Sequence, residues 1–171
     1  LEFRRVLFRS IAITEDRGVV DGLRLLMEAD RLGGPAPEAM TDRLIIGPER
    51  ARRQFTALIE GARKSIRLID AKLSDPGLID LLNTRRAEGI AVEIFGGKTL
   101  GGLRSHGKMM LIDGRTAVIG SLALTALSLD FRREVALRVD DPAAVAQIDK
   151  LFRSIATVTG ANGRAQAVTA D

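Results

Sequence analysis

Two side chains that could act together on a phosphate group lie two residues apart in the middle of the chain. His106 and Lys108 are separated by Gly107 and precede an apolar run. In an extended strand, residues two apart share a face, so the imidazole and the ammonium would address one ligand. A phosphodiester repels nucleophiles through its negative charge, so a cation that holds its oxygens while a neutral histidine attacks phosphorus is a chemically sensible pairing. This chemistry needs no metal ion and no cofactor, and none is expected.

Further polar groups follow this pair along the chain. The backbone N–H and hydroxyl groups of Gly120-Ser121, after a predicted hairpin, could donate to the phosphate oxygens. Glu134 could accept a proton from the far ring nitrogen of the histidine and fix the attacking tautomer. Asp113 is either a site residue or simply the first residue of an Asp-Gly turn. The catalytic candidates are therefore His106, Lys108, Asp113 and Glu134, and the substrate-binding candidates are Gly120 and Ser121.

Most of these residues also have an ordinary structural interpretation. A single histidine is more often a surface residue than a nucleophile, and Lys108 could protect a strand edge from aggregation. Ser121 is equally a candidate helix cap, and Glu134 could serve solubility. Asp70 and Lys72 follow a predicted strand and are candidate rim residues, although a solvated loop is the better interpretation of that segment.

The elements that would position these residues follow from apolar periodicity and chain breakers. Apolar residues at helical spacing predict helices, and short β-rich runs bounded by Gly, Pro or Asp predict strands. The order, βαβαβββα after a leading helix, predicts the α/β class and a layered α/β/α sandwich with a mixed sheet. The predicted segments are a helix over 19–27, a strand over 44–46, a helix over 48–64, a strand over 65–70, a helix over 74–89, a strand over 90–95, a hairpin over 106–119 that turns at Asp113-Gly114, a strand over 132–139 and a helix over 141–155.

Composition narrows the class of protein. The chain has 171 residues, 46% of them apolar and 28% charged, which is typical of a globular domain and too short for two complete catalytic domains. It has no Cys, which excludes disulfides and thiolate metal sites, and no Trp or Tyr to stack on bases. No apolar run approaches the roughly 18 residues that a membrane span requires.

The first ten residues, LEFRRVLFRS, are similar to the translation of a sequencing adapter and are expected to be an artefact. Removing their three Arg and one Glu lowers the formal net charge from +4 to +2, which gives no strong case for an anionic partner. An offset of 125 residues then sets Asp16 on Asp141 and Met27 on Phe152, so residues 11–42 are expected to hold the closing helix of a lost first repeat and a linker. Residues 43–156 would form the catalytic domain, and residues 157–171 a disordered tail.

The spacing His106-x-Lys108-x4-Asp113-x6-Gly120-Ser121 resembles the signature of the phospholipase D superfamily. The likeness extends to Thr125, Ser128-Leu129 and Arg133-Glu134, and the segment from about Leu44 to Ile155 resembles the second half of a two-motif bacterial member, such as a cardiolipin synthase-like protein. The resemblance implies an α/β/α fold, a phosphohistidine intermediate and an active site shared by two motif copies, in which one histidine attacks while the other protonates the leaving group. One copy would be half of such a site.

The leading hypothesis is phosphodiester hydrolysis or phosphatidyl transfer. The expected partners are a phosphodiester substrate, with phospholipid favoured and nucleic acid as an alternative, and a missing first repeat or second subunit that completes the site. Two other hypotheses stay open: a single-motif homodimeric nuclease and a non-catalytic, phosphate-binding remnant. The remnant is favoured by Ala123 and Arg132, at positions where the family commonly has asparagine. Location is left open between the cytoplasm and a membrane-associated state, because the native N-terminus is expected to be missing.

Overall fold

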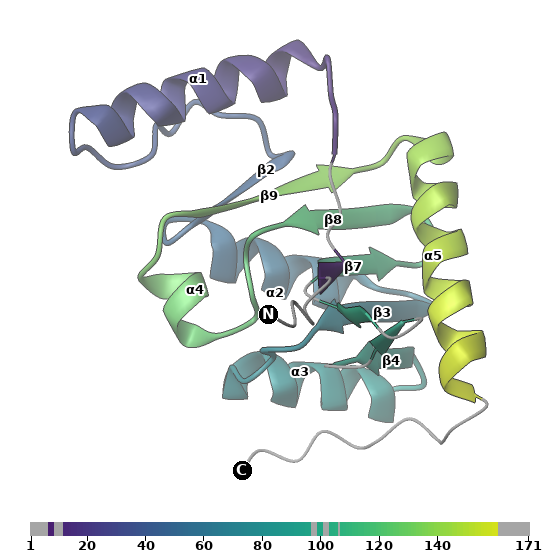
Figure 1. The fold of residues 1–171 in the computed structure, drawn as a ribbon. Coiled ribbons are helices and arrows are strands. Elements are labelled where there is room, and N and C mark those ends of the chain that lie inside the picture. The colour runs from purple at the N-terminus through teal and green to yellow at the C-terminus, as the bar shows by residue number, and fades with distance from the viewer. Residues whose placement is uncertain (1–6, 9–11, 97–98, 101–102, 106, 161–171) are drawn as a thin grey trace, which may run out of the picture.

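The main element of the fold is a six-stranded mixed sheet, seen in a computed structural model that describes residues 7–8, 12–96, 99–100, 103–105 and 107–160 (Figure 1). Its strand order is β2-β9-β8-β7-β3-β4. Only the β3–β4 pair is parallel, and the other four pairs are antiparallel. The strands are β2 (Leu44–Gly47), β3 (Ser65–Asp70), β4 (Ala91–Phe95), β7 (Lys108–Ile112), β8 (Thr116–Gly120) and β9 (Glu134–Val139).

Helices cover both faces of this sheet, which confirms the layered α/β/α arrangement. We call the two sides the α2 face and the α5 face. The α2 face packs against α2 (Ala51–Gly61), α3 (Pro76–Ala87) and α4 (Ala126–Asp130). On the α5 face, α5 (Pro142–Gly160) covers β3, β7 and β8, and α1 (Arg17–Arg31) covers β2 and β9 (Figure 1).

Alternation along each central strand separates the two apolar layers. Met110 and Val118 lie in the core of the α2 face, whereas Met109 and Leu111 lie in that of the α5 face. Because side chains alternate with a period of two, any residue of these strands can be assigned to a face by counting from its buried neighbours. This counting places the polar residues discussed below.

The predicted hairpin is confirmed, with its turn at Asp113-Gly114. Both residues have positive φ, 53° and 65°, and the N–H of Arg115 donates to the carbonyl of Ile112 at 2.9 Å. This combination is the two-residue turn that suits the twist of paired strands. It fixes the register in which Met109 pairs with Ile119 and Ile112 with Thr116.

Several elements were not predicted from the sequence. These are the short helix α4 and three short strands, β1 (Leu7–Phe8), β5 (Thr99–Leu100) and β6 (Leu103–Ser105), which form a second sheet in the order β1-β6-β5. The last helix continues to Gly160, so the prediction that the disordered tail begins at residue 157 was wrong for its first four residues. The rest of that tail, most of the adapter-like peptide and His106 lie outside the described residues.

The proposed equivalence of α1 and α5 receives mixed support. Asp16 caps α1 by accepting from the N–H of Val19 at 3.0 Å, and Asp141 accepts from the N–H of Ala144 at the start of α5 at 2.8 Å. The buried faces, however, do not correspond: Met27 is 71% exposed, whereas Phe152, its partner in the 125-residue offset, is 0% exposed. The lost first repeat therefore stays a prediction.

Candidate active site

Four of the six candidate residues meet at one end of the main sheet. Met109 pairs with Ile119, and Gly120 with Ala136, so the start of β7, the end of β8 and the start of β9 share one edge. This edge is the left-hand end of the sheet in Figure 1, beside α4. The side chains of Lys108 and Glu134 lie on the α2 face, two residues from the buried Met110 and Ala136. Gly120 and Ser121 lie between them, and His106, which precedes Lys108 by two residues, is not among the described residues.

Lys108 faces a buried carboxylate across the β3–β7 pair. It is directly paired with Asp70, whose residue is only 3% exposed. The two charges attract each other, and the ammonium has no hydrogen-bond or ion-pair partner among the described residues. A cavity of about 10 Å³, roughly the space of one water molecule, is lined by Asp70, Lys108, Gly120 and Leu124 among others. Lys108 is therefore a half-buried cation whose charge is available to an anion at the edge of the sheet.

Gly120 and Ser121 hold the end of β8 against β9. An added Cβ at Gly120 would lie 2.4 Å from the Val135 carbonyl oxygen and 2.4 Å from Ala136 Cα, so the glycine is required by the neighbouring strand. The Ser121 N–H donates to the carbonyl of Val135 at 2.9 Å. Its hydroxyl donates to the same carbonyl at 3.2 Å and accepts from the Val135 N–H at 3.1 Å. The hydroxyl that was expected to donate to phosphate is thus engaged with β9 in this structure.

Glu134 has one satisfied and one unsatisfied oxygen. Its Oε1 accepts from the hydroxyl of Ser128, on α4, at 3.2 Å. Its Oε2 is buried and has no hydrogen-bond partner within the part of the chain that the structure describes. Buried polar atoms are normally paired, and an unpaired one usually marks a strained or functional group. The Oε2 atom can therefore accept a hydrogen bond from a donor that reaches the same edge of the sheet.

Asp113 is not brought to this edge, because it follows the opposite end of β7. Its carboxylate accepts from three backbone N–H groups, those of Arg63 at 2.9 Å, Lys64 at 2.7 Å and Ser65 at 2.9 Å. Burial alone would raise the pKa of Asp113, but these bonds outweigh it and the pKa is lowered. Asp113 therefore joins the β7–β8 turn to the start of β3.

The loop after Ser121 is fixed by a chain of polar contacts. The N–H of Leu124 donates to Asp70 Oδ2 at 2.6 Å, and its carbonyl accepts from the N–H groups of Ser74 and Asp75, each at 3.0 Å. Arg52 then links Asp75 to Asp130, at the end of α4, with both contacts at 2.6 Å. These hydrogen bonds of the two aspartates hold the pKa of each below its ordinary value. The loop and α4 are thereby tied to α2 and α3.

Sequence reasoning missed the importance of Asp70. The prediction of a solvated loop was wrong here, because Asp70 is the buried last residue of β3 and accepts from the Lys72 N–H at 2.8 Å. A charged residue that ends an otherwise apolar strand was the signal that could have revealed it.

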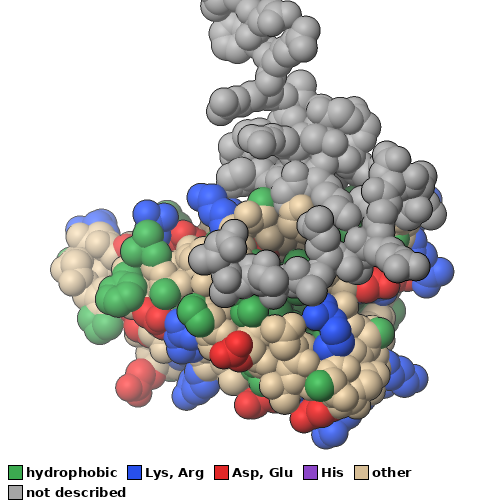
Figure 2. Space-filling view, turned by 90° about the horizontal axis from the view of Figure 1, so that it is seen from below, with side chains coloured by type: hydrophobic (Ala, Val, Ile, Leu, Met, Phe, Trp, Pro, Cys, Tyr) green, Lys and Arg blue, Asp and Glu red, His purple; other side chains and the backbone are tan. Residues whose placement is uncertain are grey.

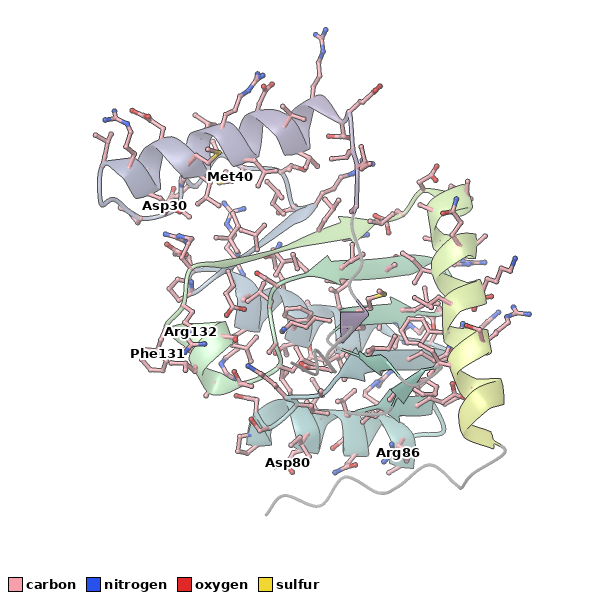
Figure 3. All side chains as sticks on the ribbon, viewed as in Figure 1. Asp30, Met40, Asp80, Arg86, Phe131 and Arg132 are labelled. Carbon is pink, nitrogen blue, oxygen red and sulfur yellow. The ribbon has the colours of Figure 1, made fainter. Side chains whose placement is uncertain are left out.

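The two positions where the family commonly has asparagine also differ in setting. Ala123 is buried, whereas Arg132 is exposed and projects outward beside Phe131 at the end of α4 (Figure 3).

On the face of the molecule seen from below, Lys and Arg side chains are interspersed with Asp and Glu (Figure 2). Within the described ranges, no three His, Cys, Asp or Glu side chains are grouped so that they could hold a metal ion. Of the helices described, none has the length and apolar character needed to cross a bilayer.

Several solved structures have a similar fold. Nuc from Salmonella typhimurium, described as a phospholipase D family member, is 19% identical with a TM-score of 0.59, over 73% of this chain and 97% of that one. NucT from Helicobacter pylori is 15% identical with a TM-score of 0.57, over 67% and 94% of the two chains. Phosphatidylserine synthase from Haemophilus influenzae is 15% identical with a TM-score of 0.55, over 66% of this chain and 38% of that one.

The sequence agrees with the fold. Residues 88–156 match the family model described as cardiolipin synthase, PLD-like domain, and this segment holds all six candidate residues. A search of curated proteins gave no significant match. On the family match over residues 88–156 and the fold together, this chain is similar to proteins of the phospholipase D superfamily.

Proposed function

We propose that this chain supplies one motif copy of a phosphodiester-cleaving or phosphatidyl-transferring active site. His106 attacks phosphorus to form a phosphohistidine or protonates the leaving group, Lys108 clamps the phosphate oxygens, and Glu134 orients the imidazole. Gly120 and Ser121 form the floor beside them. The superfamily supports phosphodiester chemistry in general terms, and the individual roles are proposals.

The observation that carries this proposal is the convergence of Lys108, Gly120 and Glu134 on one edge and one face of the sheet, with Ser121 directly after Gly120 at the same edge. Residues 106 and 108 are two apart, and side chains at that spacing share a face in an extended segment. The Oε2 of Glu134, which has no partner among the described residues, would be the acceptor that a histidine N–H needs there. Because Ser121 is engaged with β9, we assign it to shaping the loop more than to direct donation.

A phospholipid is the favoured substrate class, since the matched family is described as cardiolipin synthase-like and one structural relative is a phosphatidylserine synthase. Nucleic acid is the alternative. One motif copy makes half of a two-motif site, so a second repeat or a second subunit would contribute the other histidine. A homodimeric arrangement would need a self-complementary contact around the edge that carries Lys108.

The test measures bound oxyanion and turnover in the full chain. Wild-type protein is expected to bind orthovanadate at the site, and any turnover of bis(p-nitrophenyl) phosphate should be accompanied by an acid-labile phosphohistidine that mass spectrometry detects. His106→Ala should abolish vanadate binding and lower turnover by about a thousandfold or more, with little change in thermal stability. Lys150→Gln, an exposed change on α5, serves as the control.

Retained turnover in His106→Ala would overturn the role of the histidine. A wild-type chain that binds no vanadate would favour the non-catalytic alternative. Sedimentation distinguishes the arrangements, because activity confined to a dimer supports the homodimeric site.

A further inference from the structure

Asp70 is a buried carboxylate that the proposed mechanism does not use. It ends β3 on the α2 face, directly opposite Lys108, and contacts the loop that follows Ser121 through the N–H of Leu124. A second backbone donor, the N–H of Lys72, binds its other oxygen. Both oxygens are therefore occupied by donors, and an acceptor in that position is most favourable when it carries a negative charge.

Burial of Asp70 opposes its ionisation, whereas its hydrogen bonds and the nearby positive charges favour it. Burial raises the pKa of Asp70 above its ordinary value, and the two backbone hydrogen bonds and the positive charges of Lys108 and Lys72 offset only part of this rise. Near pH 8 an ionised carboxylate beside Lys108 leaves the pair with no net charge. An anion held by Lys108 then meets a fixed negative charge from the same pair of strands.

We propose that Asp70 is a specificity-determining residue, which makes the site favour a singly charged phosphodiester over a doubly charged phosphate monoester. The inference rests on the proposed phosphate-binding role of Lys108. The repulsion from one fixed charge grows with the charge of the ligand, so a dianion loses about twice as much as a monoanion at the same place. A site that offered Lys108 without Asp70 would instead prefer the dianion. The carboxylate thus selects substrates by charge, and it does so without contacting them.

A purely structural role for Asp70 predicts something different. If the carboxylate only held Leu124, its removal would loosen the loop and weaken the binding of both ligands to a similar extent. The ratio of the two affinities separates the explanations, because a uniform loss cancels in the ratio and a charge effect does not.

The experiment compares methyl phosphate with dimethyl phosphate at pH 8, where the monoester carries two charges and the diester one. Dissociation constants for both are measured by NMR titration of full-length wild-type protein and of Asp70→Asn, a change that removes the charge at nearly constant size. The Asp70→Asn variant should shift the affinity ratio toward the monoester by about threefold to tenfold, the range expected for one charge at roughly 6–8 Å in partly solvated surroundings. Asp149→Asn removes a charge near Arg67 on the α5 face and controls for net charge.

An unchanged ratio in Asp70→Asn overturns the proposal, whatever happens to stability. An equal shift in Asp149→Asn also overturns it, because the effect would then be a general one of net charge. Lys108→Gln tests the underlying site separately. If Lys108→Gln binds both ligands as tightly as wild type, Lys108 does not hold the phosphate. If Lys108→Gln loses both ligands but Asp70→Asn leaves the affinity ratio unchanged, Lys108 holds the phosphate and only the charge selection by Asp70 is disproved.

Discussion

Asp70 and Asp113 occupy the two ends of the β3–β7 pair, and both bind backbone N–H groups. Asp113 joins a turn to a strand start, and Asp70 joins a strand end to the loop beside the candidate site. The same residue type thus stabilises the fold at one end of β7 and, in our proposal, selects the substrate at the other end. Which of the two applies depends on the neighbouring residue, since only Asp70 faces Lys108.

Gly120 gives a prediction at the scale of the residue. In Gly120→Ala the new methyl group would meet the backbone of Val135 and Ala136 at 2.4 Å, and β9 could yield only by breaking its pairing with β8. We expect the free energy of unfolding to fall by about 2–3 kcal/mol, as for an overpacked site. Urea denaturation measures this loss. Gly61→Ala is the control that should lose nothing, because an added Cβ there would meet no described atom within 4 Å apart from its chain neighbours and its own helix backbone. Equal stability of Gly120→Ala and wild type would contradict the geometry.

At the scale of elements, Arg133 joins three parts of the fold at the sheet edge. It donates to Asp30 on α1 at 2.8 Å, to the Gly47 carbonyl at the end of β2 at 2.9 Å, and to Glu49, just before α2, at 2.6 Å. These bonds hold α1 onto β2 and β9 beside the apolar contacts of Val19 and Leu26. The attachment of α1 is therefore partly ionic and should respond to pH.

The prediction at this scale concerns acid stability. The hydrogen bonds from Arg133 lower the pKa of Glu49 from 4.5 to about 2. A pKa depressed in the folded state adds stability above the unfolded value of 4.5, and this stability is lost as the pH falls toward 2. Glu49→Gln should therefore lower the free energy of unfolding at pH 7 by about 1 kcal/mol, and its stability should decline less steeply between the two pKa values. Urea denaturation across this pH range checks the slope, and parallel curves for the variant and wild type would argue against the contribution.

At the scale of the whole molecule, the sheet holds together segments far apart in the sequence, while the adapter-like peptide adds little. Only Leu7 and Phe8 of that peptide are described, as a two-residue strand paired with Arg104 and Ser105. So short a pairing is marginal in water. The stability of the molecule should therefore reside in the six-stranded sheet and its helices.

Removing residues 1–10 tests this view. We expect the melting temperature to change by less than about 2 °C, since a loss of 1 kcal/mol would move it by roughly 2–4 °C for a domain of this size. Calorimetry on the shortened chain gives the value. A fall of more than about 5 °C would show that the peptide is an integral part of the fold.

The main elements were predictable because their signals are local. The strand over 65–70, the proline that opens α3 and the Asp-Gly turn each depend on a few neighbouring residues. The short α4 carries too few residues for a periodic signal, although Thr125 caps it by accepting from the Ser128 N–H at 3.1 Å. The burial of Asp70 arises from a partner strand and a loop more than fifty residues away, which no local pattern records.

The candidate site was predicted only in part, because some of its contacts depend on residues far apart in the sequence. The two-residue period alone places Lys108 on one face, but the meeting of Lys108 with Glu134 depends on the register of β8 between them. Asp113 belongs to the sequence motif and yet lies at the far end of β7, because spacing along a strand says nothing about which end faces the ligand. Engagement of the Ser121 hydroxyl by β9 is likewise a property of the assembled sheet.

The pairing of β2 with β9 has a consequence for how the chain matures on the ribosome. Leu44 to Gly47 are synthesised before their neighbours, Glu134 to Leu137, which are added some ninety residues later. Until then β2 has no partner for its backbone groups on that side, and the apolar surface beneath α1 cannot be closed. Nascent chains of this protein should depend on chaperones that shield the unpaired strand. The pairing of β2 with β9 should be a late, slow folding step, because the two strands are far apart in the sequence.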